Sequence, residues 1–325
     1  FGTASGNNSI AVGGSATATA TTTGVSSIAI GSGAAITGFG NTTAILNSLD
    51  NDIRGTGLAF ANTSAADKNG FISTSSIALG NSTITALNTA SGGGVSIGSG
   101  NNVNAAMYSV AIGIGNKVAS AGNSTDGFSL ALGAGNLASG TQTMAIGVSS
   151  QATAMYATAI GKQAFAQAES AIALGTVATA AGANAIALGT NANVAGTNAI
   201  GIGLGANVAG ANSIGLGANA NASVTSTIAI GLNANTSASN ALSIGSNATA
   251  TTGGGVAIGS GANSAASEGI AIGATTKAIG NQSTVIGNDV NTSLTAIQAV
   301  VIGSNFNSNQ TTTTGKGGVS IGSGL

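Results

Sequence analysis

A short motif that ends in glycine recurs every 14 residues through the middle of this chain, and this period constrains the fold more than any other feature. The glycines of the regular run are Gly133, Gly147, Gly161, Gly175, Gly189, Gly203, Gly217, Gly231, Gly245, Gly259, Gly273 and Gly287. Looser copies end at Gly13, Gly31, Gly80, Gly98, Gly113, Gly303 and Gly322. A fixed short period is typical of a solenoid, in which each repeat forms one coil stacked on its neighbours.

The residues before each glycine predict a first β-strand. The residue immediately before the glycine is Ile, Leu or Val in every repeat, and the residue three before it is apolar except at Thr158 and Thr284. Apolar residues at alternate positions are typical of a short strand with one buried face, and β-branched residues suit that setting. We therefore expect these large aliphatic side chains to fill the interior of the coil.

The residues after each glycine predict a second strand. Small residues occupy the third and fifth positions, as at Ala192 and Val194, and a mostly polar residue lies between them. The small residues are expected inside and the polar ones outside. This outer Asn column comprises Asn193, Asn207, Asn221, Asn235 and Asn263. It is predicted to be either a ligand-facing ladder or a structural stack of amides on a solvated face.

Two short strands and two tight turns use up the 14-residue period. A helix is excluded because the apolar spacing is two and glycine is frequent. Proline is absent, as expected where every strand donates hydrogen bonds to neighbouring coils. The sequence therefore predicts an all-β parallel β-solenoid, or β-roll, of two-strand coils.

The middle residue of the first strand points away from the aliphatic residues that flank it. It is Ala, Ser, Gly or Val in every repeat, without the charges or amides of a solvated face. We infer that this side packs closely on another chain under closed rotational symmetry, the alternative being an exposed Ala-rich sheet. The candidate inter-chain residues are Ala111, Ala131, Ala145, Ala159, Ala173, Ala187, Gly201, Gly215, Ala229, Ser243, Ala257 and Ala271.

The composition excludes most chemical functions. Charged residues are 4% and the net charge is -1, so no basic patch for nucleic acid or anionic membrane is expected. The absence of His and Cys removes the usual general bases, nucleophiles and soft metal ligands. Asp50 and Asp52 are the only close carboxylates, too few oxygens for Ca²⁺. We predict no enzyme activity, no catalytic residues, no cofactor, no metal and no membrane-spanning segment.

The repeat is interrupted between Gly31 and Gly80, which predicts three parts. These are N-terminal β-roll coils at 1–31, a non-repeat insertion or cap at 32–76, and further β-roll repeats at 77–325. Within the interruption, Leu58-Ala59-Phe60 is similar to a degenerate coil, and 42–49 is predicted as a strand or short helix. A non-repeating insertion in a regular solenoid is either a recognition element or a cap over the open end of the solenoid. Its candidate recognition residues are Phe39, Asp50, Asp52, Arg54, Phe60, Asp67, Lys68 and Phe71.

The repeats resemble a known family. Ser109-Val110-Ala111-Ile112-Gly113, Asn184-Ala185-Ile186-Ala187-Leu188-Gly189 and Asn212-Ser213-Ile214-Gly215-Leu216-Gly217 are similar to the Asn-Ser-Val-Ala-Ile-Gly motif of YadA-like heads of trimeric autotransporter adhesins. The resemblance covers 1–31 and 77–325. It implies a left-handed β-roll, a homotrimer, and binding of the extracellular matrix or cell surfaces outside a Gram-negative bacterium.

The chain also departs from that family's pattern. It shows no basic neck, no heptad stalk and no strands of a membrane anchor, and its charge is low. Anchoring in the outer membrane is therefore expected through a part not in this chain. The sequence leaves open a structural filament subunit that assembles end to end, and, further off, a phage fibre segment or an ice-binding solenoid.

Overall fold

The computed structural model describes residues 94–104, 108–119, 128–304 and 316–323, and before residue 94 it describes chiefly the backbones of ten short strands. The chain divides into two compact units, 1–166 and 167–325. Each unit is a parallel β-solenoid, and no helix occurs in the described ranges. The predicted fold class is confirmed.

Unit 1 contains first strands and second strands that form separate parallel sheets. The first strands are β2 (Ser9–Val12), β4 (Ser27–Ile30), β6 (Thr42–Leu46), β8 (Gly57–Ala61), β9 (Ser76–Leu79), β11 (Val95–Ser99), β13 (Val110–Ile114), β15 (Leu130–Ala134), β17 (Met144–Val148) and β19 (Thr158–Lys162). The second strands are β10 (Thr83–Ile84), β12 (Asn102–Asn104), β14 (Lys117–Ala119), β16 (Leu137–Ala138), β18 (Gln151–Ala152) and β20 (Phe165–Ala166). A further parallel sheet joins β1 (Thr3–Ser5), β3 (Thr17–Ala20), β5 (Ala34–Gly38) and β7 (Asn51–Ile53).

Four of these strands lie inside the predicted insertion at 32–76. β6 and β8 pair in register with their neighbours β4 and β9, and β5 and β7 extend the sheet of β3. The repeat therefore continues through part of this stretch. The physical reason is that β6 and β8 keep the alternating strand sequence although they lack the closing glycine by which the repeats were recognised.

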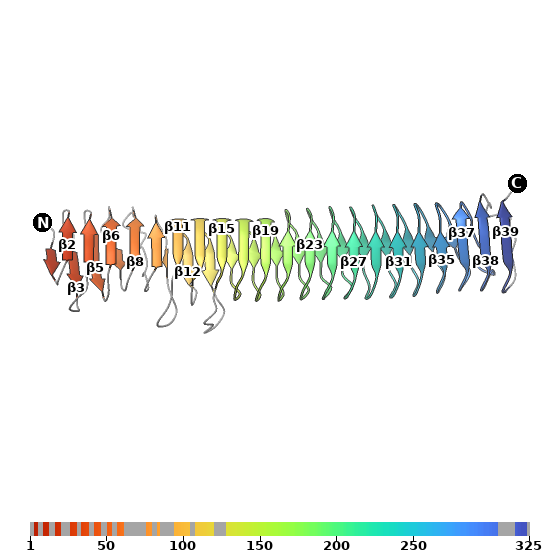
Figure 1. The fold of residues 1–325 in the computed structure, drawn as a ribbon, viewed down its shortest axis with the longest axis horizontal. Helices are drawn as coiled ribbons and strands as arrows, with labels where there is room; N and C mark the ends of the chain where they lie inside the picture. The colour runs from red at the N-terminus through yellow and green to blue at the C-terminus, as the bar shows by residue number, and fades with distance from the viewer. Residues whose placement is uncertain are drawn as a thin grey trace. The chain divides into compact units, whose positions relative to one another are not determined.

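Unit 2 has the same two-sheet arrangement. Its first strands are β21 (Ile172–Leu174), β23 (Ile186–Leu188), β25 (Ile200–Ile202), β27 (Ile214–Leu216), β29 (Ile228–Ile230), β31 (Leu242–Ile244), β33 (Val256–Ile258), β35 (Ile270–Ile272), β37 (Thr284–Asn288), β38 (Val300–Ser304) and β39 (Val319–Ser323). Its second strands are β22 (Thr179–Ala180), β24 (Asn193–Val194), β26 (Asn207–Val208), β28 (Asn221–Ala222), β30 (Asn235–Thr236), β32 (Thr249–Ala250), β34 (Asn263–Ser264) and β36 (Lys277–Ala278). Figure 1 shows β23, β27, β31 and β35 following one another in the same direction.

The pairing register equals the sequence period. β23 pairs with β25 so that Ile186 lies beside Ile200 and Leu188 beside Ile202, each 14 residues further along the chain. Equivalent residues therefore form columns along the stack. Each column position repeats at the strand spacing of about 4.8 Å.

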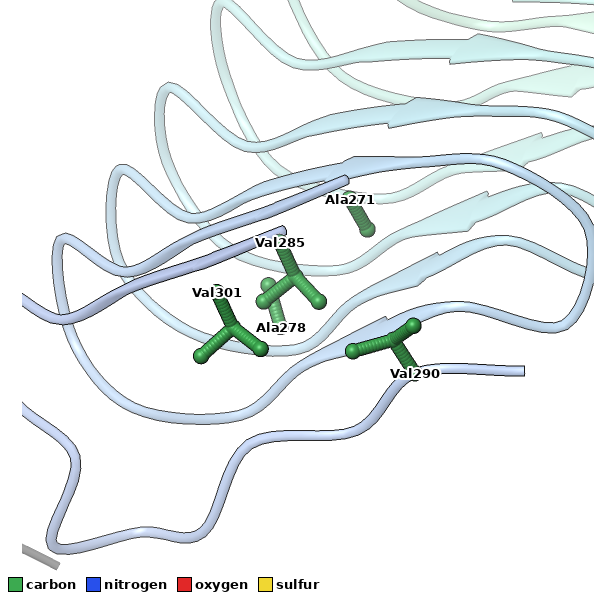
Figure 2. Packing of buried hydrophobic residues seen from close by; sticks show 5 residues of the cluster. All are labelled: Ala271, Ala278, Val285, Val290 and Val301. Atoms are coloured by element: carbon green, nitrogen blue, oxygen red, sulfur yellow. The ribbon is translucent and has the colours of Figure 1, made fainter. Parts of the chain in front are cut away.

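The interior of the coil is filled by small side chains rather than large ones. Ala187 in the middle of β23 is 0% exposed, as are Ala192 and Val194 of the second half of the same coil. Figure 2 shows the corresponding packing of Ala271, Ala278, Val285, Val290 and Val301, whose side chains meet between the two strand layers. The prediction for the second strand is confirmed. The prediction that the large aliphatics of the first strand fill the core is wrong, because its middle residue faces inward.

A substitution at Ala187 tests this orientation. We expect Ala187→Leu to lower the free energy of unfolding by about 2 kcal/mol or more, because the coil interior has no space for three further carbons. The matched control is Ala195→Leu, since Ala195 is exposed on the second-strand side of the same coil. Urea unfolding followed by circular dichroism measures both. Equal stability of the two variants would contradict the inward orientation of Ala187.

Turns recur every seven residues, twice per coil. A positive φ is found at this interval from Gln142 to Asp289, for example at Asn184 (φ +55°) and Asn191 (φ +57°). Asn tolerates this left-handed conformation better than most residues because its short polar side chain forms local hydrogen bonds. The many Asn-Ala pairs of the sequence therefore mark the turns.

Buried Asn side chains form a hydrogen-bonded ladder inside the coils of unit 1. Asn116 Nδ2 donates to the carbonyl oxygens of Ile112 and Gly133, at 3.0 and 2.8 Å. Its Oδ1 accepts from the backbone N–H and the Nδ2 of Asn136, at 3.0 and 2.9 Å. Asn101 lies one coil before it and makes the equivalent bonds. These amides satisfy backbone groups at the bend, which explains why polar residues are tolerated inside the coil.

Candidate interaction surfaces

The predicted inter-chain residues do not lie on a surface. All ten Ala and Ser side chains of the set are 0% exposed within a single chain, and Gly201 and Gly215 are buried with them. A Cβ atom added at Gly201 would lie 2.5 Å from Val194 Cγ2 of its own chain. The prediction that these residues contact another chain is therefore wrong, since they form the interior of the coil.

The outward side of the first strand carries the large aliphatic residues instead. We call the two columns at the first and third positions before each closing glycine the apolar strand face. In unit 2 its first five coils contribute Ile172, Leu174, Ile186, Leu188, Ile200, Ile202, Ile214, Leu216, Ile228 and Ile230. Side chains from adjacent coils cover one another in part, yet Ile202 remains 38% exposed. The face contains no charged residue over these coils.

An uninterrupted face of this kind is unusual on a soluble single chain. Water-exposed apolar patches larger than a few hundred Å² mark contact surfaces with other molecules. Burial of aliphatic area is favourable by about 25 cal/mol per Å². The apolar strand face is therefore the strongest candidate contact surface in the described residues.

The second strand presents a polar surface. In the outer Asn column, the side-chain Nδ2 of Asn193 donates to Oδ1 of Asn207 at 3.2 Å, Asn207 donates to Asn221 at 2.9 Å, and Asn221 to Asn235 at 2.7 Å. Asn193 and Asn207 are exposed, and Asn221, Asn235 and Asn263 are half-buried. The two inner amides of this ladder, Asn207 and Asn221, each use one donor and one acceptor along the stack, so capacity remains for outside groups.

Further amide ladders run along the turns. Asn184 donates to Asn198 at 3.0 Å, and Asn198 donates to Asn212 at 3.2 Å. On the other turn, Asn233 accepts from Asn219 at 3.3 Å and donates to Asn247 at 3.1 Å. These turn residues were missed in the sequence, although their seven-residue interval was the signal that could have identified them. A polar, hydrogen-bonded rim thus follows the stack.

The described residues hold no cluster suited to metal binding. No group of three or more His, Cys, Asp and Glu side chains occurs in the ranges the structure covers. Those ranges also contain no helix long and apolar enough to cross a membrane.

Most candidate recognition residues of the 32–76 stretch lie outside the described residues. These are Phe39, Asp50, Arg54, Asp67, Lys68 and Phe71. Asp52 and Phe60 are placed by their backbones only, in β7 and β8. A recognition role for this stretch stays a prediction.

The repeats of this chain match a known protein family. Five segments match the family described as the YadA head domain repeat, at 4–34, 138–164, 166–192, 209–234 and 265–289. No curated protein matches the chain. Two of the matched segments lie wholly within unit 2 and two within unit 1, so both units carry this repeat.

Proposed function

We propose that this chain, a YadA-like head domain by its repeats and its parallel β-solenoid fold, is the non-enzymatic adhesive head of a trimeric fibre on a bacterial surface. The observation that carries the proposal is the contrast between two sides of each coil. One side is an uncharged aliphatic face that requires a covering partner, and the other is a hydrogen-bonded polar surface suited to contact with water and ligands.

The apolar strand face supports self-association. Rotational symmetry about an axis along the stack brings the apolar strand faces of identical coils together without leaving an open end to the assembly. Three copies are proposed because YadA-like heads are trimeric. The small interior residues support this arrangement indirectly, because a core of Ala and Val buries little aliphatic area within one chain.

Adhesion is assigned to the polar sides and the turns. In the proposed trimer these surfaces face outward, and both carry Asn amides at intervals of 14 residues, as at Asn221 and Asn235 on the second strand and at Asn233 and Asn247 on the turn. A matrix polymer or cell surface offers many copies of its own groups, so weak contacts add up by multivalency. Attachment to the outer membrane through another part of the protein belongs to the same proposal.

A binding assay on two states of assembly tests this function. The probes are extracellular matrix laid down by cultured cells and the same matrix digested with protease. We expect saturable binding of the assembled protein to intact matrix, and binding at least 100-fold weaker for a variant that stays a single chain, because avidity is lost. No binding above that of an unrelated solenoid would contradict the adhesin proposal. Concentration-dependent growth into fibres would favour a structural filament.

A further inference from the structure

A cleft opens at the beginning of four first strands of unit 1. Its volume is about 330 Å³, and the first residues of β13, β15, β17 and β19 line it: Val110, Leu130, Met144 and Thr158. Tyr108 and Phe128, in the turns before β13 and β15, form a wall. Their rings stack with centroids 5.2 Å apart and an interplanar angle of 14°. The cleft therefore borders the start of the apolar strand face.

The wall of the cleft is incompletely covered. Tyr108 is 49% and Phe128 is 59% exposed. Aromatic side chains supply the largest apolar area per residue and are enriched where protein chains meet. No charged residue lines the cleft. Its lining includes the polar residues Ser129, Gln142, Thr143 and Thr158, but most of the exposed lining surface is apolar, so an apolar group is the chemistry that fits it.

Apolar side chains project from the opposite ends of the same strands. Ile114 at the end of β13 is 66% exposed, and Val148 at the end of β17 is 49% exposed. Ala134 at the end of β15 lies between them and is small, so the two larger side chains stand apart as separate knobs. With about 4.8 Å between neighbouring strands, the knobs are about 10 Å apart along the stack.

In a rotationally symmetric assembly, the cleft at the beginning of these strands in one chain lies beside the ends of the same strands in the next chain. In a closed ring of three or more copies the contacts are heterologous, so one edge of each chain meets the opposite edge of the next. An axis parallel to the stack keeps equivalent coils at the same height. The start of β13–β17 in one copy then lies beside the end of β13–β17 in its neighbour.

We propose that the Tyr108–Phe128 cleft receives Ile114 and Val148 of a second copy of this chain. The inference rests on the proposed self-association and adds to it which residues make the lateral contact. The cleft thereby fixes the axial register between chains, since a shift by one coil would place Ala134 or Lys162 at positions that the larger knobs occupy.

Cysteine pairs test the contact directly, because the chain has no Cys of its own. The double variant Gln142→Cys/Val148→Cys places one thiol at the cleft and one at the knob of the same coil. Gln142 lies two residues before β17 and Val148 is its last residue, so the strand between them, about 13 Å long, separates the two positions too far for a disulfide within one chain. A disulfide must therefore join two copies. Tyr108→Cys/Ile114→Cys is a second pair with the same spacing, since Tyr108 lies two residues before β13 and Ile114 is its last residue.

We expect mild oxidation to convert most of the double variant into covalent oligomers on a non-reducing denaturing gel, and both single variants to remain as single chains. A double variant that is assembled in solution but not cross-linked would overturn the proposed contact and leave the cleft to another occupant. A double variant and parent protein that are both single chains in solution would instead refute the self-association on which the inference rests. Recovery of the single-chain band on reduction confirms the disulfide.

Discussion

Gly259→Ala is expected to destabilise the solenoid by about 3 kcal/mol or more. Gly259 has φ +131°, a conformation essentially restricted to glycine, and a Cβ atom there would lie 2.4 Å from the carbonyl oxygen of Gly273 in the next coil. The added methyl group must either push neighbouring coils apart or force the bend into another conformation. Both break hydrogen bonds between stacked strands. The midpoint of urea unfolding, followed by circular dichroism, measures the effect.

Gly261→Asn is the matched control in the same turn. Gly261 has φ +68°, and its nearest contact for an added Cβ is Thr275 Cγ2 at 3.5 Å. The equivalent position one coil earlier is Asn247 with φ +56°. We expect this larger substitution to change stability by less than about 0.5 kcal/mol. If Gly259→Ala were tolerated as well as Gly261→Asn, the close approach of the stacked glycines would be refuted.

Ile202→Asp is expected to abolish self-association while the coil itself remains folded. Ile202 belongs to the apolar strand face and is 38% exposed in one chain, so a carboxylate there can stay hydrated until the chains meet. Burying it between chains then costs several kcal/mol per copy, and we expect the association constant to fall at least 1,000-fold, or about 4 kcal/mol. Sedimentation velocity measures the loss of the assembled species.

The control for this variant is Ala209→Asp. Ala209 is exposed on the second-strand side of the same coil, so the same charge is introduced on the polar surface. We expect the mass in solution to be unchanged by Ala209→Asp. Dissociation by both variants would show that added charge acts non-specifically, and the apolar strand face would lose its assigned role.

The repeat and the two strands per coil could be predicted because they depend on spacing, and the inward small residues of the second strand could be predicted because its other side is polar. A period of 14 with alternation of two leaves one arrangement of strands. The second strand has one small side and one polar side, as at Ala192 and Asn193, so its orientation is determined by polarity.

The orientation of the first strand could not be predicted from polarity, since neither side of it is polar. Alternation shows which residues share a side but not which side is inside. Side-chain volume determines which side of the first strand faces inward. The two strand layers are so close that a Cβ atom added at Gly201 would already contact Val194. The inner columns at Ala185, Ala187, Ala192 and Val194 are all small, and this uniformity was the available signal.

The lateral cleft lay beyond sequence analysis for a different reason. Tyr108 and Phe128 are 20 residues apart, outside the regular period, and become neighbours only when the strands align in register. Their relation to Ile114 and Val148 depends on a second chain. The positions of the strand ends in three dimensions are therefore needed to recognise the cleft.

The mass in solution shows whether the aliphatic side of the first strand is a contact surface between copies of this chain. Sedimentation equilibrium over a series of protein concentrations gives this mass without reference to shape. We predict a constant mass of three times the 30.0 kDa of one chain. A mass of 30.0 kDa at every concentration would contradict it, because the apolar strand face would then be stable in contact with water.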